Sequence, residues 1–382
     1  MSNKTAPNPH TPSQNTPSRT GAPSDSSPIQ HPKGTASIVF WSIAVVVALL
    51  ALYAVLQVDN WGDSGNNLPT RFGLDTAKLA AVDPALVNYA ETQQYPIAMQ
   101  SVRGIASLPD GGFVVAGDKT IQRFSRDGEP TESISCADEP ICVTVAGDDH
   151  VMAGHLFVGF VARIDVFDTQ GQLTRTIDDG FDPQTQITSL AVLEDYIYAA
   201  DAGNRVIARF AADGKRLGSI GKADPSRKIP PFIVPSAHFD IVGSDDGILR
   251  AVNPGARRIQ AFTLDGDLLG SWGKASAGIE GFFGCCNPAA LALLPDGRFV
   301  TAEKGIPRVK VYAADGTFES VVATTDMLSA NASSSIDIRD DHRADVLDVA
   351  TDPNGRVLVL DPNTRAVRIF ELKTEMVSTD ES

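Results

Sequence analysis

The chain has 382 residues, 43% of them hydrophobic, and carries a formal net charge of −15. This length accommodates either two average domains or one large all-β unit, so it decides neither the domain number nor the fold class. The first 37 residues contribute +2, which leaves −17 on the rest of the chain. Because nucleic-acid binding needs a basic face that displaces counterions, this charge argues against a nucleic-acid partner.

Residues 1–37 are predicted to form a disordered tail. They are rich in Pro, Ser, Thr and Asn and contain almost no aliphatic side chains. Such a segment cannot bury enough apolar surface to offset the entropy that it would lose on ordering.

Residues 38–57 are predicted to form a transmembrane signal anchor. In the run from Ile38 to Leu56, Ser42 is the one strongly hydrophilic residue. Nineteen helical residues cover about 28 Å, which matches the hydrocarbon core of a bilayer. This run is longer than the apolar region of a cleaved signal peptide and ends without a small-x-small cleavage site, so we expect it to be retained.

The charges beside this apolar run predict its orientation. Lys4, Arg19 and Lys33 precede it against Asp25 alone, and acidic residues follow it. Because positive flanks stay on the cytoplasmic side, the amino terminus is expected in the cytoplasm and the chain after residue 57 in the periplasm or outside the cell. Residues 58–85 are expected to be a spacer with a short helix near residues 76–81.

A repeated pattern then predicts the fold of residues 86–374. An aromatic residue follows a short alternating run and precedes a turn glycine by four positions, which is the pattern of a strand entering a tight hairpin. The glycines of successive copies are 43, 43, 52 and 50 residues apart, the spacing of propeller blades. The copies are Phe124 with Gly128, Phe167 with Gly171, Phe210 with Gly214, Phe262 with Gly266, Tyr312 with Gly316, and Phe370 without the glycine.

These copies resemble NHL repeats. The segment IYAADAGNRVIARFAADG (197–214) looks like the core strand pair of an NHL repeat, and NPAALALLPDGRFVTAEKGIPRVKVYAADG (287–316) looks like a whole blade that opens with the family's entry Pro. GSIGK at 218–222 recurs as GSWGK at 270–274. The resemblance covers residues 98–372 and implies an all-β, six-bladed propeller of the NHL/TolB-like type. Its blades are expected at 98–134, 135–180, 181–221, 222–273, 274–323 and 324–372.

A propeller of this kind must close between its last blade and its first. The alternating segment Val87–Pro96 is expected to supply the outer strand of the last blade, with Lys373–Val377 as the alternative. Residues 375–382 are then expected to be a carboxy-terminal tail.

All four cysteines follow the predicted anchor and therefore suit an oxidising compartment. Cys136 and Cys142 are expected to form a local disulfide. Cys285 and Cys286 are adjacent, so they either form a strained disulfide between neighbours, which would give a rigid plate beside a ligand, or stiffen a loop or pair elsewhere. The pairs fall in the second and fifth blades, on opposite sides of the expected channel mouth. Without C-x-x-C spacing, a four-cysteine zinc site is disfavoured.

The sequence predicts a ligand-binding site around the adjacent cysteines. Cys285, Cys286 and Asn287 lie in the unusual stretch GFFGCCNP, just before the inner strand of the fifth blade. His238 and Asp240 lie at the corresponding point of the fourth blade, where His238 is alternatively a capping or hydrogen-bonding residue. We therefore expect all five near the channel mouth.

The function predicted first is a binding or scaffolding module for a protein partner or small ligand at the channel mouth. The alternatives are a channel-centred metal-dependent hydrolase or lyase, and a redox role for the adjacent cysteines.

No cofactor and no catalytic residue are predicted. The hydrolase would need calcium, for which resemblance to lactonase-type propellers implies carboxylate and amide ligands. A lyase of the peptide-amidating kind would use channel histidines, which are scarce here, and His150 and His155 are expected on the surface. The candidate channel oxygens belong to Asp240, Asn287, Asp348, Glu303 and Asp361.

Overall fold

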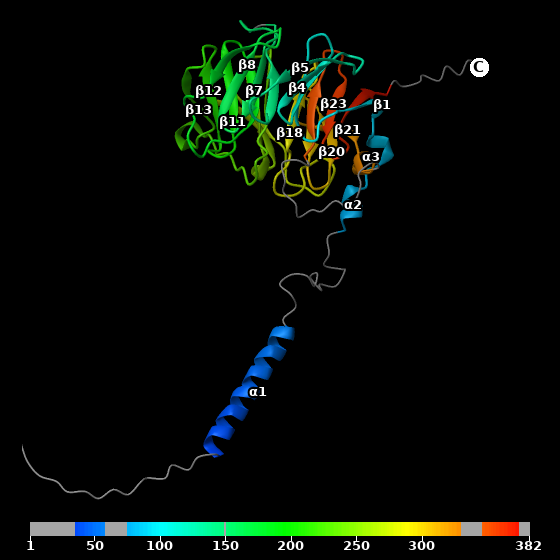
Figure 1. Ribbon diagram of the computed structural model, residues 1–382. Coiled ribbons are helices and arrows are strands. Elements are labelled where there is room, and N and C mark those ends of the chain that lie inside the picture. The colour runs from blue at the N-terminus through cyan, green and yellow to red at the C-terminus, as the bar shows by residue number, and fades with distance from the viewer. Residues whose placement is uncertain (1–34, 58–74, 149, 330–345, 374–382) are drawn as a thin grey trace, which may run out of the picture. The chain divides into compact units, whose positions relative to one another are not determined.

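The computed structural model describes residues 35–57, 75–148, 150–329 and 346–373 (Figure 1). The chain divides into two units, residues 1–73 and 74–382, which we describe separately. Most of the predicted tail, the first part of the spacer and the carboxy-terminal tail lie outside the described residues.

Helix α1 (Thr35–Gln57) is the element of the first unit and begins three residues before the predicted anchor. Its side chains are described for residues 39–50, and nearly all of them are exposed. Of the residues that the structure describes, none forms a helix that is both long enough and apolar enough to cross a membrane. The anchor therefore stays a prediction.

The second unit is a six-bladed β-propeller, as the repeats predict, with one four-stranded antiparallel sheet in each blade (Figure 1). Blade 1 contains β2 (Val102–Ser107), β3 (Phe113–Gly117), β4 (Thr120–Phe124) and β5 (Pro130–Ser135). Blade 2 contains β6 (Cys142–Val145), β7 (Leu156–Phe160), β8 (Arg163–Phe167) and β9 (Leu173–Ile177). Blade 3 contains β10 (Ile187–Leu193), β11 (Tyr196–Asp201), β12 (Val206–Ala211) and β13 (Arg216–Ile220).

The next two blades have the same order. Blade 4 contains β14 (Ile241–Ser244), β15 (Ile248–Asn253), β16 (Arg258–Phe262) and β17 (Leu268–Trp272), with the 3-10 turns η3 (Pro225–Arg227) before it and η4 (Pro254–Ala256) within it. Blade 5 contains β18 (Ala290–Leu293), β19 (Phe299–Glu303), β20 (Arg308–Tyr312) and β21 (Phe318–Ala323), followed by helix α3 (Thr325–Ser329). In each blade the first strand is the innermost, so β2, β6, β10, β14, β18 and β22 surround the central channel.

The sixth blade joins the two ends of the propeller. It contains β22 (Asp348–Thr351), β23 (Val357–Asp361) and β24 (Ala366–Leu372), and its outer strand is β1 (Tyr89–Pro96). Strand β1 runs antiparallel to β24, from Tyr89 opposite Leu372 to Pro96 opposite Ala366. The segment expected to close the ring does so and occupies the outer edge of β24. The alternative segment, residues 373–377, lies outside the described residues except for Lys373.

The spacer ends in two short helical segments that lead into β1. Helix α2 (Thr76–Ala80) forms where a short helix was expected, and Asp75 caps it by accepting a hydrogen bond from the Lys78 backbone at 3.0 Å. The 3-10 turn η2 (Pro84–Leu86) follows. The carbonyl of Leu79 accepts a hydrogen bond of 3.4 Å from Arg308, so α2 lies against blade 5.

The repeated aromatic residues form the cores between blades. All six aromatic residues are at most 5% exposed, so the repeated pattern reflects their burial as well as the geometry of the turn. The glycine that follows has a positive φ in each of the five copies that keep it, between 72° and 89°. The aromatic–glycine pattern thus marks a strand that ends in the core, followed by a turn whose positive φ is rarely adopted by residues other than glycine.

Gly316 illustrates how the turn and the packing combine. Its φ is 85°, and a Cβ at this position would lie 2.5 Å from the Trp272 ring. Gly305 has a φ of 80° with nothing within 4 Å of that point. We expect Gly316→Ala to lower the free energy of unfolding clearly more than Gly305→Ala, which carries only the backbone strain of about 1–2 kcal/mol. Urea unfolding of both variants measures this; equal losses would show that the Trp272 contact is unimportant.

Candidate functional site: the channel and the cysteine loop

The inner strands enclose a cavity of about 1360 Å³, which we call the channel. Residues from all six blades line it. Small and aliphatic side chains of the inner strands line much of it, together with three arginines and seven carboxylates. The carboxylates are Asp138, Glu139, Asp240, Asp245, Asp246, Asp296 and Asp348.

Asp240 and Asp348 occupy equivalent places at the start of inner strands β14 and β22. The Oδ2 atom of Asp240 accepts a hydrogen bond of 2.6 Å from the backbone of Leu291, in the next blade. In the same way, Oδ2 of Asp348 accepts one of 3.0 Å from the backbone of Ile105, across the junction of blades 6 and 1. Each carboxylate also accepts from the backbone of its following residue, at 2.8 and 2.9 Å respectively. Both side chains therefore join adjacent blades while staying partly exposed to the channel.

The channel makes both carboxylates weaker acids than usual. Burial raises the pKa of Asp240 to about 6, against hydrogen bonds from Ser189, Leu291 and Ile241 that favour the charged form. For Asp348, burial and then the charge of Asp240 raise the pKa to about 7. The two groups therefore interact, and near neutral pH they carry less negative charge together than they would in water.

These shifts predict how stability depends on pH. Because the pKa of Asp348 is raised from 3.8 to about 7, the native state binds more protons than the unfolded state between these values. This stabilisation is complete below about pH 4 and is lost as the pH rises to about 7. Since Asn does not titrate, the free energy of unfolding of the wild type minus that of Asp348→Asn should fall across this range, as measured by urea unfolding at several pH values.

Asp315→Asn is the matched control with the opposite sign. Hydrogen bonds from Thr317 lower the pKa of Asp315, so its contribution is present above the ordinary carboxyl pKa and is lost as the pH falls. The difference between wild type and Asp315→Asn should therefore not decrease with rising pH. If the Asp348 difference is constant or grows with pH, the carboxyl of Asp348 is not a weakened acid.

The structure divides the five predicted ligand-binding residues between two places. His238 and Asp240 line the channel, and His238 is 8% exposed. Cys285, Cys286 and Asn287 instead lie in the segment before β18, which we call the cysteine loop (residues 274–287), and they do not line the cavity. The two groups therefore do not form one continuous wall.

Asn287 holds the end of the cysteine loop. It is 3% exposed, and its Nδ2 atom donates to the carbonyls of Phe283 at 2.6 Å and Lys304 at 3.0 Å. Its Oδ1 atom accepts from the Lys304 backbone at 2.8 Å. These contacts give Asn287 a structural role, and its contact with a ligand stays a prediction.

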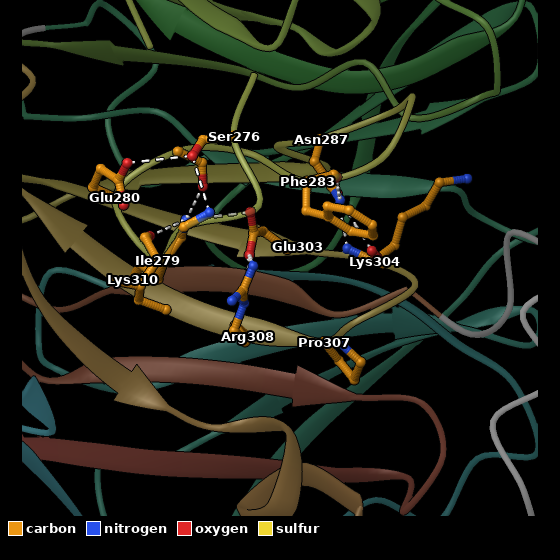
Figure 2. Close-up of polar contacts among 12 residues, drawn as sticks. Ser276, Ile279, Glu280, Phe283, Asn287, Glu303, Lys304, Pro307, Arg308 and Lys310 are labelled. Carbon is orange, nitrogen blue, oxygen red and sulfur yellow. Dashed lines mark hydrogen bonds and ion pairs between the residues drawn. The ribbon is translucent and has the colours of Figure 1, made fainter. Parts of the chain in front are cut away.

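Lys310 holds the other side of the cysteine loop (Figure 2). Its Nζ atom donates to the carbonyls of Ile279 at 3.0 Å and Gly281 at 2.7 Å, and lies 4.8 Å from the centre of the Phe282 ring. Lys310 and Phe282 are both 0% exposed. Burial lowers the pKa of Lys310 to about 8, and the charge of Glu303 opposes this shift.

Glu303 is the anion of a fully buried charge cluster beneath this loop (Figure 2). It lies 2.8 Å from Arg308 and 3.2 Å from Lys310, and none of the three side chains is more than 2% exposed. Glu303, a candidate calcium ligand, therefore forms ion pairs with two cations inside blade 5. Asp361 likewise lies beside Arg368, at 3.6 Å, inside blade 6.

The expected oxygen donors are thus not assembled in one place. Of the five named candidates, Asp240 and Asp348 line the channel. Among the described residues, no group of three or more His, Cys, Asp or Glu side chains is placed to hold a metal ion. The expectation for His150 is wrong, because it is 4% exposed, packs edge-on against Phe157 and accepts a hydrogen bond of 2.9 Å from the Met152 backbone.

The predicted disulfide between Cys136 and Cys142 is not formed. All four cysteines lie in the described part of the chain, and no disulfide joins any of them. Cys142 begins β6 and packs in the core between blades 2 and 3, whereas Cys136 packs against the core between blades 1 and 2. The two side chains thus belong to different cores, which is why nearness in sequence does not pair them. Cys142, but not Cys136, lines the channel.

Cys285 and Cys286 are also unbonded, but their sulfurs are close. The two Sγ atoms lie 3.1 Å apart. Cys285 is exposed and Cys286 is 4% exposed. The pair is a dithiol at the surface end of a well-held loop, and the disulfide between neighbours is not present.

Comparison with solved structures finds several chains of similar fold. A streptogramin B lyase matches with a TM-score of 0.52 and 12% identity over 76% of this chain and all of its own. A virginiamycin B lyase from Staphylococcus aureus matches with a TM-score of 0.51 and 13% identity over 75% of this chain and 100% of its own. A Bacteroides thetaiotaomicron protein of unknown function matches with a TM-score of 0.52 and 15% identity, over 75% of this chain and 76% of its own. At these identities the matches show the fold alone.

Sequence comparison adds no family. No family model matches the chain, and the comparison with curated proteins finds no match either. The similarity to these solved structures is therefore one of fold, and the six blades of this chain follow from its own six sheets.

Proposed function

We propose that the protein is a binding module, an NHL-type propeller that is anchored at a membrane by residues 38–57 and holds a ligand or partner at its channel on the outer side. The observation that carries this proposal is the channel itself. Its volume, about 1360 Å³, exceeds the usual range for small-molecule sites, and it is preformed by the inner strands of all six blades.

The chemistry of the channel wall supports recognition. The wall combines aliphatic side chains, such as Leu190 and Val349, with charged ones, such as Asp240 and Arg250. In a ligand site the apolar area provides affinity, and the polar groups fix the orientation of the ligand. Asp240 and Asp348 are fixed by the blade junctions that they join. Since propellers serve many functions, the proposal rests on this site and not on the fold.

Binding at the channel is tested with a substitution that narrows it. Val242 is a partly buried residue of β14 that lines the channel, whereas Leu217 is 46% exposed on the outer strand β13. Native mass spectrometry of the full chain, purified in detergent from its own cells, should show additional bound mass for wild type and for Leu217→Trp, and a loss of it for Val242→Trp. Bound mass that persists in a folded Val242→Trp variant would place the ligand elsewhere, and no bound mass in any form would contradict the proposal.

The anchor and its orientation are tested separately. A reporter enzyme that works only outside the cytoplasm, fused after Asp63, should be active if residues 38–57 form the anchor in the proposed orientation. Activity of a cytoplasmic reporter at the same position would overturn this part of the proposal and leave the channel test unaffected.

A further inference from the structure

We propose that Cys285 and Cys286 form a redox-active dithiol that undergoes thiol–disulfide exchange with small anionic disulfides, Cys285 being the attacking and Cys286 the resolving residue. This inference concerns the cysteine loop and does not depend on which ligand the channel holds.

The first support is the unequal burial of two neighbouring sulfurs. Cys285 is exposed, so a disulfide in solution can reach its sulfur. Cys286 is 4% exposed, and its sulfur lies 3.1 Å from that of Cys285. An incoming disulfide therefore meets Cys285 first, and a mixed disulfide on Cys285 forms next to the second thiol.

The reaction balances with the disulfide as the oxidant. The thiolate of Cys285 attacks one sulfur of the incoming disulfide, forms a mixed disulfide with it and releases the other half as a thiolate. Cys286 loses its proton to solvent and attacks the sulfur of Cys285, so that a bond between the two cysteines forms and the second thiolate leaves. The protein loses two electrons and two protons, and the incoming disulfide is reduced to two thiols.

The surroundings of Cys286 suit a resolving residue. Burial raises the pKa of its thiol, which keeps it protonated and unreactive toward solution. The hydroxyl of Ser236 and the charge of Lys304 act in the opposite direction and favour the thiolate. The Nζ atom of Lys304 donates to Oγ of Ser236 at 3.2 Å, so a chain of hydrogen bonds runs from Lys304 through Ser236 to Cys286.

Positive charge near the pair favours anionic disulfides. Arg257 donates to the carbonyl of Gly284, the residue before Cys285, at 3.4 Å, and the charge of Lys304 acts on Cys286. These two cations stand out on a chain whose residues 38–382 carry −17. They attract an anionic reactant locally, against the net negative charge of the chain.

The loop is also held well enough to keep the two sulfurs together. Lys310 binds the carbonyls of Ile279 and Gly281, and Asn287 binds those of Phe283 and Lys304 on the other side. Side chains whose supporting contacts are fixed react more readily than groups that must first be ordered.

The test uses the full chain in detergent with Cys136→Ser and Cys142→Ala, so that the adjacent pair is the remaining source of thiols. Oxidised glutathione is the probe, and intact mass spectrometry is the readout. We expect the parent protein to lose two hydrogens and to retain no glutathione. Adding Cys286→Ser should leave one glutathione attached to Cys285, because resolution is blocked, and Cys285→Ser should react at least tenfold more slowly.

The assignment of the two roles is overturned if Cys285→Ser accumulates glutathione as fast as Cys286→Ser. Exchange within the pair is overturned if the parent protein keeps the glutathione or stays reduced. Thermal unfolding of each variant separates these outcomes from misfolding, because the comparison is made between variants with the same transition as the parent.

The charge preference has its own control. Cystamine is a cationic disulfide, so at low salt it should oxidise the parent more slowly than glutathione does, and added salt should reduce the difference. In an Arg257→Gln, Lys304→Gln variant the difference should shrink as well. Equal rates for the two disulfides at low salt would remove the anionic preference from the proposal.

Discussion

A chain that begins at Ile97 is expected to lose the closed propeller. This truncation removes β1, the outer strand of blade 6, and leaves the hydrogen-bonding edge of β24 without its partner along seven paired positions from Tyr89 to Pro96. It also removes Tyr89, which is 1% exposed and packs in the core with Phe370. Loss of a whole strand and of one buried aromatic side chain, which alone contributes about 3–5 kcal/mol, is comparable with the total stability of a typical domain.

A second truncation provides the control. A chain that begins at Ala81 lacks α2 but keeps β1, so it should still unfold cooperatively and show the circular dichroism of a β-sheet protein. Because it loses the hydrogen bond between Leu79 and Arg308, its stability should fall, but by less than that of the chain that begins at Ile97. Circular dichroism and size-exclusion chromatography of both forms measure the effect. A monomeric, cooperatively unfolding chain that starts at Ile97 would mean that β1 is dispensable for closure.

Glu303→Ala is expected to lower the free energy of unfolding by about 3–5 kcal/mol, because it leaves buried cations without their anion. Arg308 and Lys310 are buried on either side of Glu303, at 2.8 and 3.2 Å. Burial already lowers the pKa of Lys310 to about 8, and losing the opposing charge of Glu303 should lower it further. Because Lys310 also binds two carbonyls of the cysteine loop, proteolysis within residues 274–287 should become faster in this variant.

Glu319→Ala is the matched control for that cluster. Glu319 lies 3.3 Å from Arg298 but is 37% exposed, so its removal should cost at most about 1 kcal/mol. Urea unfolding of the two variants compares a buried anion with an exposed one. The double variant Glu303→Ala, Lys310→Met should lose less than the sum of its single variants, since one of the unpaired cations is then absent. Equal losses for Glu303→Ala and Glu319→Ala would show that the buried cluster contributes little.

The fold was predictable because its signal is local and repeated. Each aromatic–glycine copy specifies one strand end and one turn, so the repeat can be recognised without knowing which blades are in contact. The closing strand was also predictable, because Val87–Pro96 alternates and has no other sheet to join. Asp240 and Asp348 were candidates for the channel because the start of an inner strand necessarily lies at its wall.

The parts that failed depend on contacts between distant segments. The disulfide between Cys136 and Cys142 was predicted because the two residues are close in sequence, but their side chains pack in cores on opposite sides of blade 2. Nothing in the run RVKVY indicates that the loop of residues 274–287 covers Lys310, so its role and that of Lys304 were missed. The position of Arg308 four residues before Tyr312 was a visible repeat, yet its ion pair with Glu303 was not.

Closure through β1 has a consequence for the order in which the chain acquires its structure. Thr92 of β1 and Ile369 of β24, which contact one another, are separated by 277 positions, so the earliest strand to be synthesised waits for the latest. During that interval its amides remain available to other chains, and pairing over so long a separation is slow. Translation of almost the entire chain must therefore precede ring formation, and a ribosome stalled before residue 366 would hold an open arc of blades whose first strand has no correct partner.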